Sequence, residues 1–439
     1  MGRKIIVAGL GHGGIAAAAL LSKSGYDVTV YEKKSEGTLG YDWTDIFAPD
    51  ALAIAGIPMP PADKFEFKED MTFFGPSVNT GYRQHVAKNN LEIKMERRDI
   101  YELLIDNALK AGVKIVYDCE VLEPLLIGSR VVGIKTSTGN YYGDLVIDAC
   151  GMYSPVRMNL PSVLGIEKEP TRKEKITIYR AFYNKASDEN VPAKFKVMLC
   201  AGNRFGVTWV ASEEEHTDVL IGRFEEFDEK EVESFTAFLR EGNPRLGDKI
   251  ERGGQFVEIP VRQPLSLMIA DGYAAIGDSA FMTVPMIGSG IANSLKAARI
   301  LHDTIIADRF ELYNCETLWN YQYTYFKQLG SGLAPLANAK LMLFKLTDRE
   351  IDYVFENGMI TEDNITIGAD FTSYTKIKFT PQELTTKAKL LCKDTVLMKK
   401  ILACGASMAR TISTCALIPH QWDPVRCRQW SKMYMKCFA

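Results

Sequence analysis

Apolar and polar positions follow each other in blocks that predict a strand–helix–strand unit at the start of the chain. An apolar run covers Lys4–Ala8, an Ala- and Leu-rich stretch covers residues 15–24, and a second apolar run covers Asp27–Tyr31. This order is typical of a buried parallel sheet with a crossover helix. The first 40 residues are therefore expected to begin an α/β domain.

Further strand and helix patterns of the same kind follow later in the chain, on both sides of a region with the alternating pattern of β-strands. Residues 97–111 have the pattern of a helix with one apolar face, and residues 291–306 predict another helix. Strands are expected at 114–117, 131–135, 144–148 and 273–276. Between the last two, β-rich runs have the spacing of an antiparallel sheet, at residues 176–183, 195–200, 205–211 and 219–224.

These elements predict an α/β fold: a Rossmann-like dinucleotide-binding domain, an antiparallel β-sheet substrate domain and a helical C-terminal region. Residues 41–94 include Pro58, Pro60, Pro61 and Pro76 and are expected to be a loop-rich connection that contacts cofactor and substrate. The expected boundaries are 1–170 and 268–315 for the two parts of the nucleotide domain, 171–267 for the β-rich domain and 316–439 for the helical region.

The first glycine-rich turn has the chemistry of a pyrophosphate site. It reads Gly9-Leu-Gly11-His12-Gly13-Gly14 and lies between the first strand and the first helix. Gly9 permits the bend, Gly11 lets the backbone approach a pyrophosphate, and Gly14 lets the helix pack on the strand. The helix N-terminus attracts negative charge. Glu32, at the end of the second strand and next to Lys33, is placed to accept hydrogen bonds from ribose hydroxyls.

Two more glycine segments follow predicted strands. The second is Asp148-Ala-Cys150-Gly151, and the third is Gly277-Asp278, which leads to a loop before the helix at 291–306. Asp278 is placed to hydrogen-bond ribityl or ribose hydroxyls. The loop glycines let backbone lie against an isoalloxazine ring, and the helix end stabilises negative charge on a reduced flavin. The candidate cofactor residues of this loop and helix start are Pro285, Gly288, Ser289, Gly290 and Ile291.

Together the three segments resemble the GxGxxG, "DG" and "GD" motifs of one flavoprotein superfamily. Its members include aromatic-ring hydroxylases, flavin halogenases, lycopene cyclases and geranylgeranyl reductases, and the resemblance covers residues 1 to about 355. The pattern from Ile259-Pro260 through Gly277-Asp278 to Gly288-Ser289-Gly290-Ile291 is most similar to geranylgeranyl-reductase-like proteins. Arg97 begins a stretch that resembles the Arg-x-x-Leu helix of the group. The resemblance implies FAD as cofactor and a GR2-type FAD-binding domain.

Some positions depart from the family pattern. Cys150 stands where most hydroxylases have Asp, which puts docking of NAD(P)H at this segment in doubt. The reactive cysteine of many reductases is absent from residues 39–45. The substrate-lining Tyr-x-Trp-x-Phe-Pro signature appears only in altered form around Trp209, and the Lys and Trp-x-Trp-x-Ile-Pro features of halogenases are missing.

Three functions remain open. The first is an FAD-dependent reductase of carbon–carbon double bonds in an apolar, isoprenoid-like substrate, with hydride from flavin N5. The second is an NAD(P)H-dependent monooxygenase that acts through a C4a-hydroperoxyflavin. The third is a non-catalytic lipid-binding escort protein, which the retention of all three motifs argues against. Candidate proton donors are Tyr41, Asp42 and Asp45, and candidate substrate-cavity residues are Trp43, Trp209 and Met286.

A second GxGxxG turn after a strand is absent from the sequence. Electrons are therefore expected from NAD(P)H bound transiently, from a small redox protein or from the substrate. The nine cysteines include no CxxC and no Cys/His pair at zinc spacing, so reduced thiols and no metal site are expected.

Composition and charge indicate where in the cell the protein is expected to act. The 439 residues are 46% hydrophobic and 24% charged, without an apolar run of membrane-spanning length, so a cytoplasmic enzyme is expected. Residues 376–439 carry twelve Lys or Arg and three acids, a net charge of +9, whereas the whole chain carries −3. This region either docks on the acidic body or contacts an anionic membrane surface. Nucleic acid is not expected as a partner, because the body is acidic.

Overall fold

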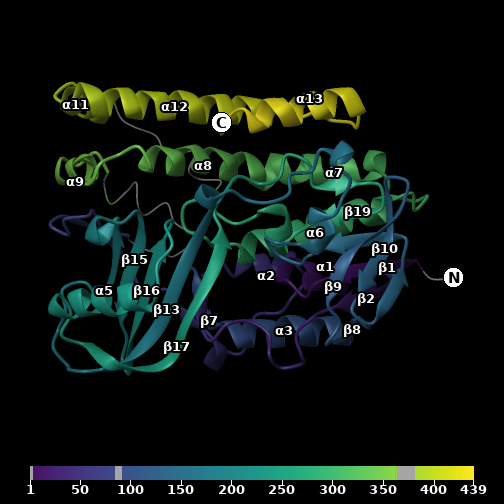
Figure 1. Ribbon diagram of the computed structural model, residues 1–439, viewed down its shortest axis with the longest axis horizontal. Coiled ribbons are helices and arrows are strands. Elements are labelled where there is room, and N and C mark those ends of the chain that lie inside the picture. Colours follow the sequence, from purple (N-terminus) through teal and green to yellow (C-terminus); the bar gives the residue numbers. More distant parts are fainter. Residues whose placement is uncertain (1–2, 85–90, 361, 363–380) are drawn as a thin grey trace.

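The computed structural model describes residues 3–84, 91–360, 362 and 381–439. Figure 1 shows two sheet regions side by side, with helices stacked across both. This arrangement confirms the predicted α/β class with a parallel sheet and a helical C-terminal region.

The nucleotide-domain sheet has six strands, and all but the edge strand β18 run parallel. Both faces are covered, so the central strands consist almost entirely of buried apolar residues. In spatial order the strands are β18 (Ile269–Ala270), β19 (Tyr273–Ala275), β12 (Leu145–Asp148), β1 (Lys4–Ala8), β2 (Asp27–Tyr31) and β8 (Lys114–Val116).

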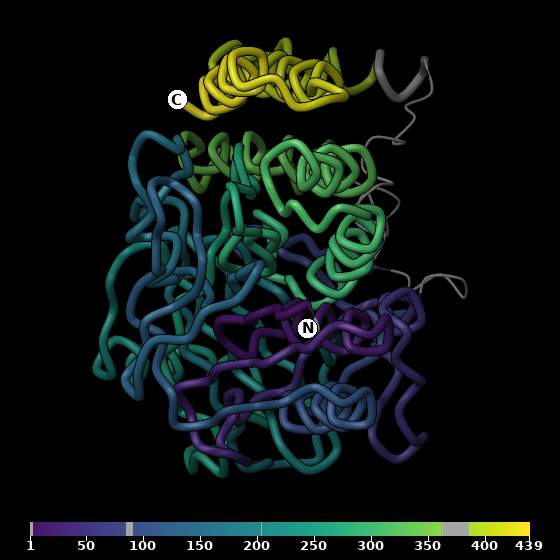
Figure 2. The backbone as a smooth tube through the Cα atoms, turned by 90° about the vertical axis from the view of Figure 1, so that its right-hand side faces the viewer, coloured from purple at the N-terminus to yellow at the C-terminus, as the bar shows by residue number. Residues whose placement is uncertain are grey.

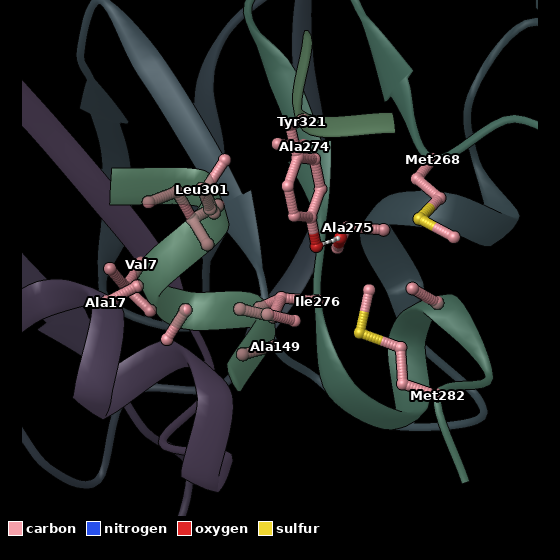
Figure 3. Close-up of a cluster of buried hydrophobic side chains, with 14 of the residues drawn as sticks. Val7, Ala17, Ala149, Met268, Ala274, Ala275, Ile276, Met282, Leu301 and Tyr321 are labelled. Atoms are coloured by element: carbon pink, nitrogen blue, oxygen red, sulfur yellow. Dashed lines mark hydrogen bonds between the residues drawn. The ribbon is translucent and has the colours of Figure 1, made fainter. Parts of the chain in front are cut away.

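Helices and a small meander cover this sheet. The helix α1 packs between α3 and α6, and β10 packs against β12. The elements are α1 (His12–Lys23), α2 (Asp50–Ile54), α3 (Arg97–Lys110), α4 (Pro155–Met158), α6 (Ile291–Ala307), β9 (Val121–Ile127), β10 (Arg130–Thr136) and β11 (Gly139–Tyr142). Figure 3 shows why the packing is close: Ala17, Ala149 and Ala274 are small, and the hydroxyl of Tyr321 donates to the backbone oxygen of Ala275 at 2.9 Å.

The second large sheet has seven strands, antiparallel except for the β14–β5 pair. One face packs on α5 (Glu229–Glu241), and the other carries an apolar cluster that includes Ile178, Phe182 and Val261. In spatial order the strands are β17 (Leu246–Pro260), β13 (Lys175–Lys185), β16 (His216–Arg223), β15 (Gly206–Ser212), β14 (Phe195–Leu199), β5 (Thr72–Phe74) and β6 (Gly81–Arg83).

Residues 41–94 are more structured than expected. Two of their strands, β5 and β6, extend the seven-stranded sheet, and three more strands form a separate sheet: β3 (Thr44–Phe47), β7 (Ile93–Glu96) and β4 (Glu66–Phe67). The expectation of a loop-rich connection missed them because strands of two to four residues between prolines carry too little periodicity.

The C-terminal helices form two layers, which both views show at the top of the molecule (Figures 1 and 2). Within the outer layer, Trp430 Nε1 donates to Thr414 O at 2.8 Å. The layer is attached to the body by the Tyr434 hydroxyl, which donates to Pro264 O at 3.1 Å, and by Trp319 Nε1, which donates to Pro419 O at 2.7 Å. The helices are α7 (Cys315–Tyr325), which continues through a π-helical turn into α8 (Ser331–Leu343), then α9 (Asp348–Glu356), α11 (Pro381–Leu391), α12 (Thr395–Ala416) and α13 (Pro424–Met435).

One buried carboxylate joins the ends of the central strands. Asp148, the last residue of β12, is fully buried. It accepts hydrogen bonds from Ser154 Oγ at 2.6 Å, Tyr273 Oη at 2.9 Å, Ser279 Oγ at 3.0 Å and the Cys150 amide at 3.1 Å. The second and third glycine segments are therefore held together by a single side chain.

We expect Asp148→Ala to lower the free energy of unfolding by about 3 kcal/mol or more, because it leaves several buried donors without an acceptor. Asp144→Ala is the matched control: that exposed carboxylate accepts one backbone hydrogen bond, from Lys4, and its loss should cost about 1 kcal/mol. Urea unfolding followed by circular dichroism measures both. Equal losses for the two variants would contradict the anchoring role of Asp148.

Candidate functional site

The first glycine turn lies directly on the other two glycine segments. A Cβ on Gly14 would come within 2.5 Å of Ala149 Cβ, beside Asp148, and one on Gly13 would come within 2.9 Å of Ile276 Cγ1. Only glycine permits these approaches. The turn, α1 and the segments around Gly151 and Gly277 therefore meet at one edge of the parallel sheet, where ligands bind in open α/β folds.

Two helix N-termini open at this edge. α1 follows Gly11 and α6 follows Gly290; neither has a side-chain cap, and neither has an acidic residue in its first turn. Their first amides and positive dipole ends are therefore left for an anion. His12, the first residue of α1, also has a buried Nε2 without a partner in the described structure. These groups fit a dinucleotide with a pyrophosphate and an electron-rich ring.

Glu32 is held against the first turn. Its carboxylate is buried and accepts hydrogen bonds from the amides of Leu10 at 2.8 Å and Lys34 at 2.9 Å. Each oxygen keeps a lone pair, so the group can still accept from ribose hydroxyls. Lys33 beside it is exposed.

Asp278 follows β19 and faces the start of α6. Solvent reaches its side chain, but the protein atoms around it raise the pKa of the carboxyl, an effect that the hydrogen bond from Thr283 at 3.1 Å and the charge of Arg97 only partly offset. Its Oδ1 lies 3.5 Å from the place of a Cβ on Gly290. Asp278 is thus positioned between the end of a central strand and a free helix N-terminus.

The loop before α6 closes on itself and contacts the seven-stranded sheet. Val284 N donates to Ser289 O at 2.9 Å, Pro285 is buried, and Met286 is exposed. A Cβ on Gly288 would lie 3.3 Å from Ile259 and 3.9 Å from Val261, at and just beyond the end of β17. Ile291 then begins α6. The loop therefore borders the apolar face of the seven-stranded sheet.

Arg97 and Asp45 form a bidentate ion pair beside the first turn. Nε and Nη2 of Arg97 each lie 2.6 Å from an oxygen of Asp45. Burial acts to raise the pKa of the Asp45 carboxyl, but the charge and hydrogen bonds of Arg97 outweigh it and lower the pKa. Burial, together with Arg97, also lowers the pKa of His12 to about 4. At neutral pH Asp45 is ionised and His12 is neutral.

The three candidate proton donors therefore differ. Asp45 is ionised because it pairs with Arg97, so it has no proton to donate. Asp42 accepts hydrogen bonds from Arg252 and Gly253 at the exposed rim. Tyr41 packs under the Arg97 guanidinium at 4.8 Å, and burial raises the pKa of its phenol. Tyr41 therefore keeps its proton at neutral pH, whereas Asp45 does not.

The candidate substrate residues lie in two places. Trp43 is buried in the apolar cluster, with its indole Nε1 unpaired within the described chain. Trp209 donates its Nε1 to Asp218 at 3.2 Å, and both rings flank the guanidinium of Arg180, at 5.9 and 5.0 Å. Met286 lies instead on the loop before α6. Arg180 was missed from the sequence because its partners lie 38 and 136 residues away.

No known family model matches this chain. It is 25% identical over 387 residues to the digeranylgeranylglycerophospholipid reductase of Haloferax volcanii, covering 80% of this chain and 88% of that protein. A geranylgeranyl bacteriochlorophyll reductase-like protein from Thermoplasma acidophilum has a similar fold, with a TM-score of 0.70 and 19% identity over 92% of this chain and 100% of that one.

The p-nitrophenol 4-monooxygenase of Pseudomonas putida also has a similar fold, with a TM-score of 0.61 and 17% identity over 93% of this chain and 98% of that one. These relatives agree with the resemblance of the three glycine segments. In sequence the chain is similar to an FAD-dependent reductase of isoprenoid lipids, and in fold to geranylgeranyl reductase-like proteins and flavin monooxygenases.

Proposed function

We propose that this protein reduces carbon–carbon double bonds of an isoprenoid lipid with FAD as its cofactor. The observation that carries the proposal is the contact between the loop before α6 and the apolar sheet face at Ile259 and Val261. An apolar wall beside a flavin site suits an apolar substrate better than a small polar ring. The name of the Haloferax volcanii relative supports the same substrate class.

The residues around the glycine turns would hold the cofactor. The α1 N-terminus would bind the pyrophosphate, Glu32 the adenosine ribose, and Asp278 the ribityl hydroxyls, while the α6 N-terminus would stabilise negative charge on the ring. Gly9, Gly11 and Gly151 would line the backbone approach. When bound, FAD supplies the hydride chemistry that reduction of a double bond requires.

The protein also has to supply a proton. Tyr41 holds one on its phenol oxygen, because burial raises the pKa of this group. Arg97, anchored by Asp45, fixes the ring from one side, and Trp43 packs against it at 5.2 Å. We assign Tyr41 as the proton donor and Arg97 with Asp45 as its positioning pair.

Two features bear on the electron donor and the place of action. Burial raises the pKa of the Cys150 thiol well above its usual value, so a neutral group stands at the position where most hydroxylases have Asp. This favours a low-potential redox carrier over NADPH. The basic C-terminal region and a lipid substrate favour peripheral action at an anionic membrane. Among the described residues, no helix has both the length and the apolar character to cross a bilayer.

The purified protein should be yellow, and Asp278→Ala should weaken FAD binding roughly tenfold to a hundredfold, the effect of losing a hydrogen bond to a charged group. Titration of the apoprotein, followed by flavin fluorescence, measures the dissociation constant. Asp303→Ala, at the exposed far end of α6, is the matched control and should bind FAD normally. A colourless protein that FAD cannot reconstitute would exclude both enzymatic functions.

Under anaerobic conditions, the chemically reduced holoenzyme should convert an isoprenoid olefin to a product heavier by two hydrogen atoms. Tyr41→Phe should slow this turnover about 10²-fold or more, with FAD affinity unchanged, whereas Asp42→Asn should not. Mass spectrometry of the product and single-turnover kinetics measure these effects. A product that contains one added oxygen atom and forms only in air would instead identify a monooxygenase.

NADPH should reduce the bound flavin slowly, and dithionite or a low-potential carrier should reduce it faster, because Cys150 provides no carboxylate for docking. Stopped-flow absorbance gives both rates. Rapid and saturable reduction at micromolar NADPH would refute the inference from Cys150.

A further inference from the structure

The outer layer of C-terminal helices uses only one of its sides for packing. The inner side is buried on the body of the protein and includes Leu397, Thr411 and Cys415 of α12 and Trp430 and Tyr434 of α13. Figures 1 and 2 both show α12 and α13 outside α7 and α8. The opposite side of both helices therefore faces outward.

This outward side carries large apolar side chains that water reaches. Six of them are between 40% and 67% exposed: Val396, Leu402, Ile412, Leu417, Val425 and Met433. Within α12, exposed positions of all kinds recur every three or four residues along the side opposite Leu397, Thr411 and Cys415, and the exposed apolar residues lie among them. Exposed apolar patches of this kind mark interaction surfaces.

The same outward side is basic. Lys399, Arg410, Arg426, Arg428, Lys432 and Lys436 are exposed, and none forms an ion pair with a described residue. The nearby acidic residues are helix caps. Asp394 caps α12, and Asp423 caps α13 by accepting hydrogen bonds from the backbone amides of Val425 and Arg426. Lys376 and Lys378, counted in the sequence, lie outside the described residues.

The structure also corrects which apolar residues accompany the charges. Leu397, Trp430 and Tyr434 are interleaved with the basic residues in the sequence, but all three are buried against the body. Leu402 and Met433 do face outward. The charge pattern identified the segment, whereas the helix orientation had to come from the structure.

We infer that the outward face of α12 and α13 docks on a bilayer that contains anionic lipid, with the basic side chains at the headgroups and the apolar ones between them. A second copy would bring two positive faces together, and nucleic acid would leave the exposed Leu and Val side chains without a partner. An anionic bilayer satisfies both kinds of residue. The inference rests on the proposed function, because a lipid substrate must be taken from a membrane.

The docking face is connected to the middle of the molecule. Ser431 of α13 shares a hydrogen bond of 2.7 Å with Ser266, and Tyr434 bonds to Pro264 O. These partners lie between the end of β17, in the substrate sheet, and the strand before Asp278. A protein seated on this face therefore holds its substrate sheet and its cofactor loop at a fixed height above the membrane.

Sedimentation of the full-length holoenzyme with vesicles tests this surface. Phosphatidylcholine vesicles should bind little protein, whereas vesicles that also contain phosphatidylglycerol should bind it at low salt. The variant with Arg426→Glu, Arg428→Glu, Lys432→Glu and Lys436→Glu should lose binding more than a hundredfold, since each basic residue contributes roughly fivefold. The variant with Leu402→Ser, Leu417→Ser and Val425→Ser should bind at low salt but release at moderate salt.

Two matched control variants carry the same kinds of substitution at exposed positions outside α12 and α13. Exposed apolar residues are replaced in Leu109→Ser, Ile127→Ser and Val163→Ser, and exposed lysines in Lys110→Glu, Lys194→Glu, Lys230→Glu and Lys249→Glu. Both controls should bind anionic vesicles as the natural chain does. The inference fails if the natural chain never sediments with anionic vesicles at low salt, if the controls lose binding equally, or if the α13 charge variant changes only the oligomeric state in gel filtration.

Flavin absorbance and turnover of a short water-soluble olefin are measured on the same samples. Vesicle binding by a protein that holds FAD but never reduces an olefin would support the docking face and refute the proposed reaction. Loss of vesicle binding with normal turnover of the soluble olefin is the expected result for the α13 charge variant, and it separates docking from catalysis.

Discussion

The fold depends on the buried carboxylate of Asp148. A carboxylate that is removed from water is costly unless donors surround it, and here the donors come from two segments of the chain, residues 150–154 and 273–279. Gly151 N also donates to Ser279 Oγ at 2.8 Å, so one side chain and one hydroxyl fix the second and third glycine segments. The two helix N-termini open at the same edge because of this arrangement.

A second constraint joins the cofactor side to the substrate side. Neighbouring side chains of a strand point to opposite faces, so Thr44 and Asp45 of β3 point in opposite directions. Arg180 donates hydrogen bonds to the carbonyl oxygen of Thr44 at 2.5 Å and to its hydroxyl oxygen at 2.6 Å. In the seven-stranded sheet, Arg180 also forms an ion pair with Asp218. Asp45 binds Arg97 at the start of α3. Two neighbouring residues of β3 thus connect the six-stranded and the seven-stranded sheet regions.

The sequence predicted the parts of the molecule that are continuous in the chain. β1 and β2 have the predicted bounds, and α6 differs by one residue at its end, because an unbroken apolar run beside a glycine turn has few other conformations. β17 was not predicted: its 15 residues include charged positions and a double-glycine irregularity. The pairing of Asp45 with Arg97 was also missed, because no local pattern reports a contact across 52 residues.

The insertion of the seven-stranded sheet determines the order in which the protein can assemble. Asp148 and its partner Tyr273 are 125 residues apart, and the whole of β13 to β17 is synthesised between them. As the chain leaves the ribosome, β1, β2, β8 and β12 are present while the Asp148 carboxylate still lacks two of its donors. The strands β13 to β17 are synthesised before β19, which the six-stranded sheet still needs. Completion of the six-stranded sheet is therefore a late step that depends on long-range contacts, and such steps are slow. Until β19 pairs with β12, the edge of the sheet is left exposed.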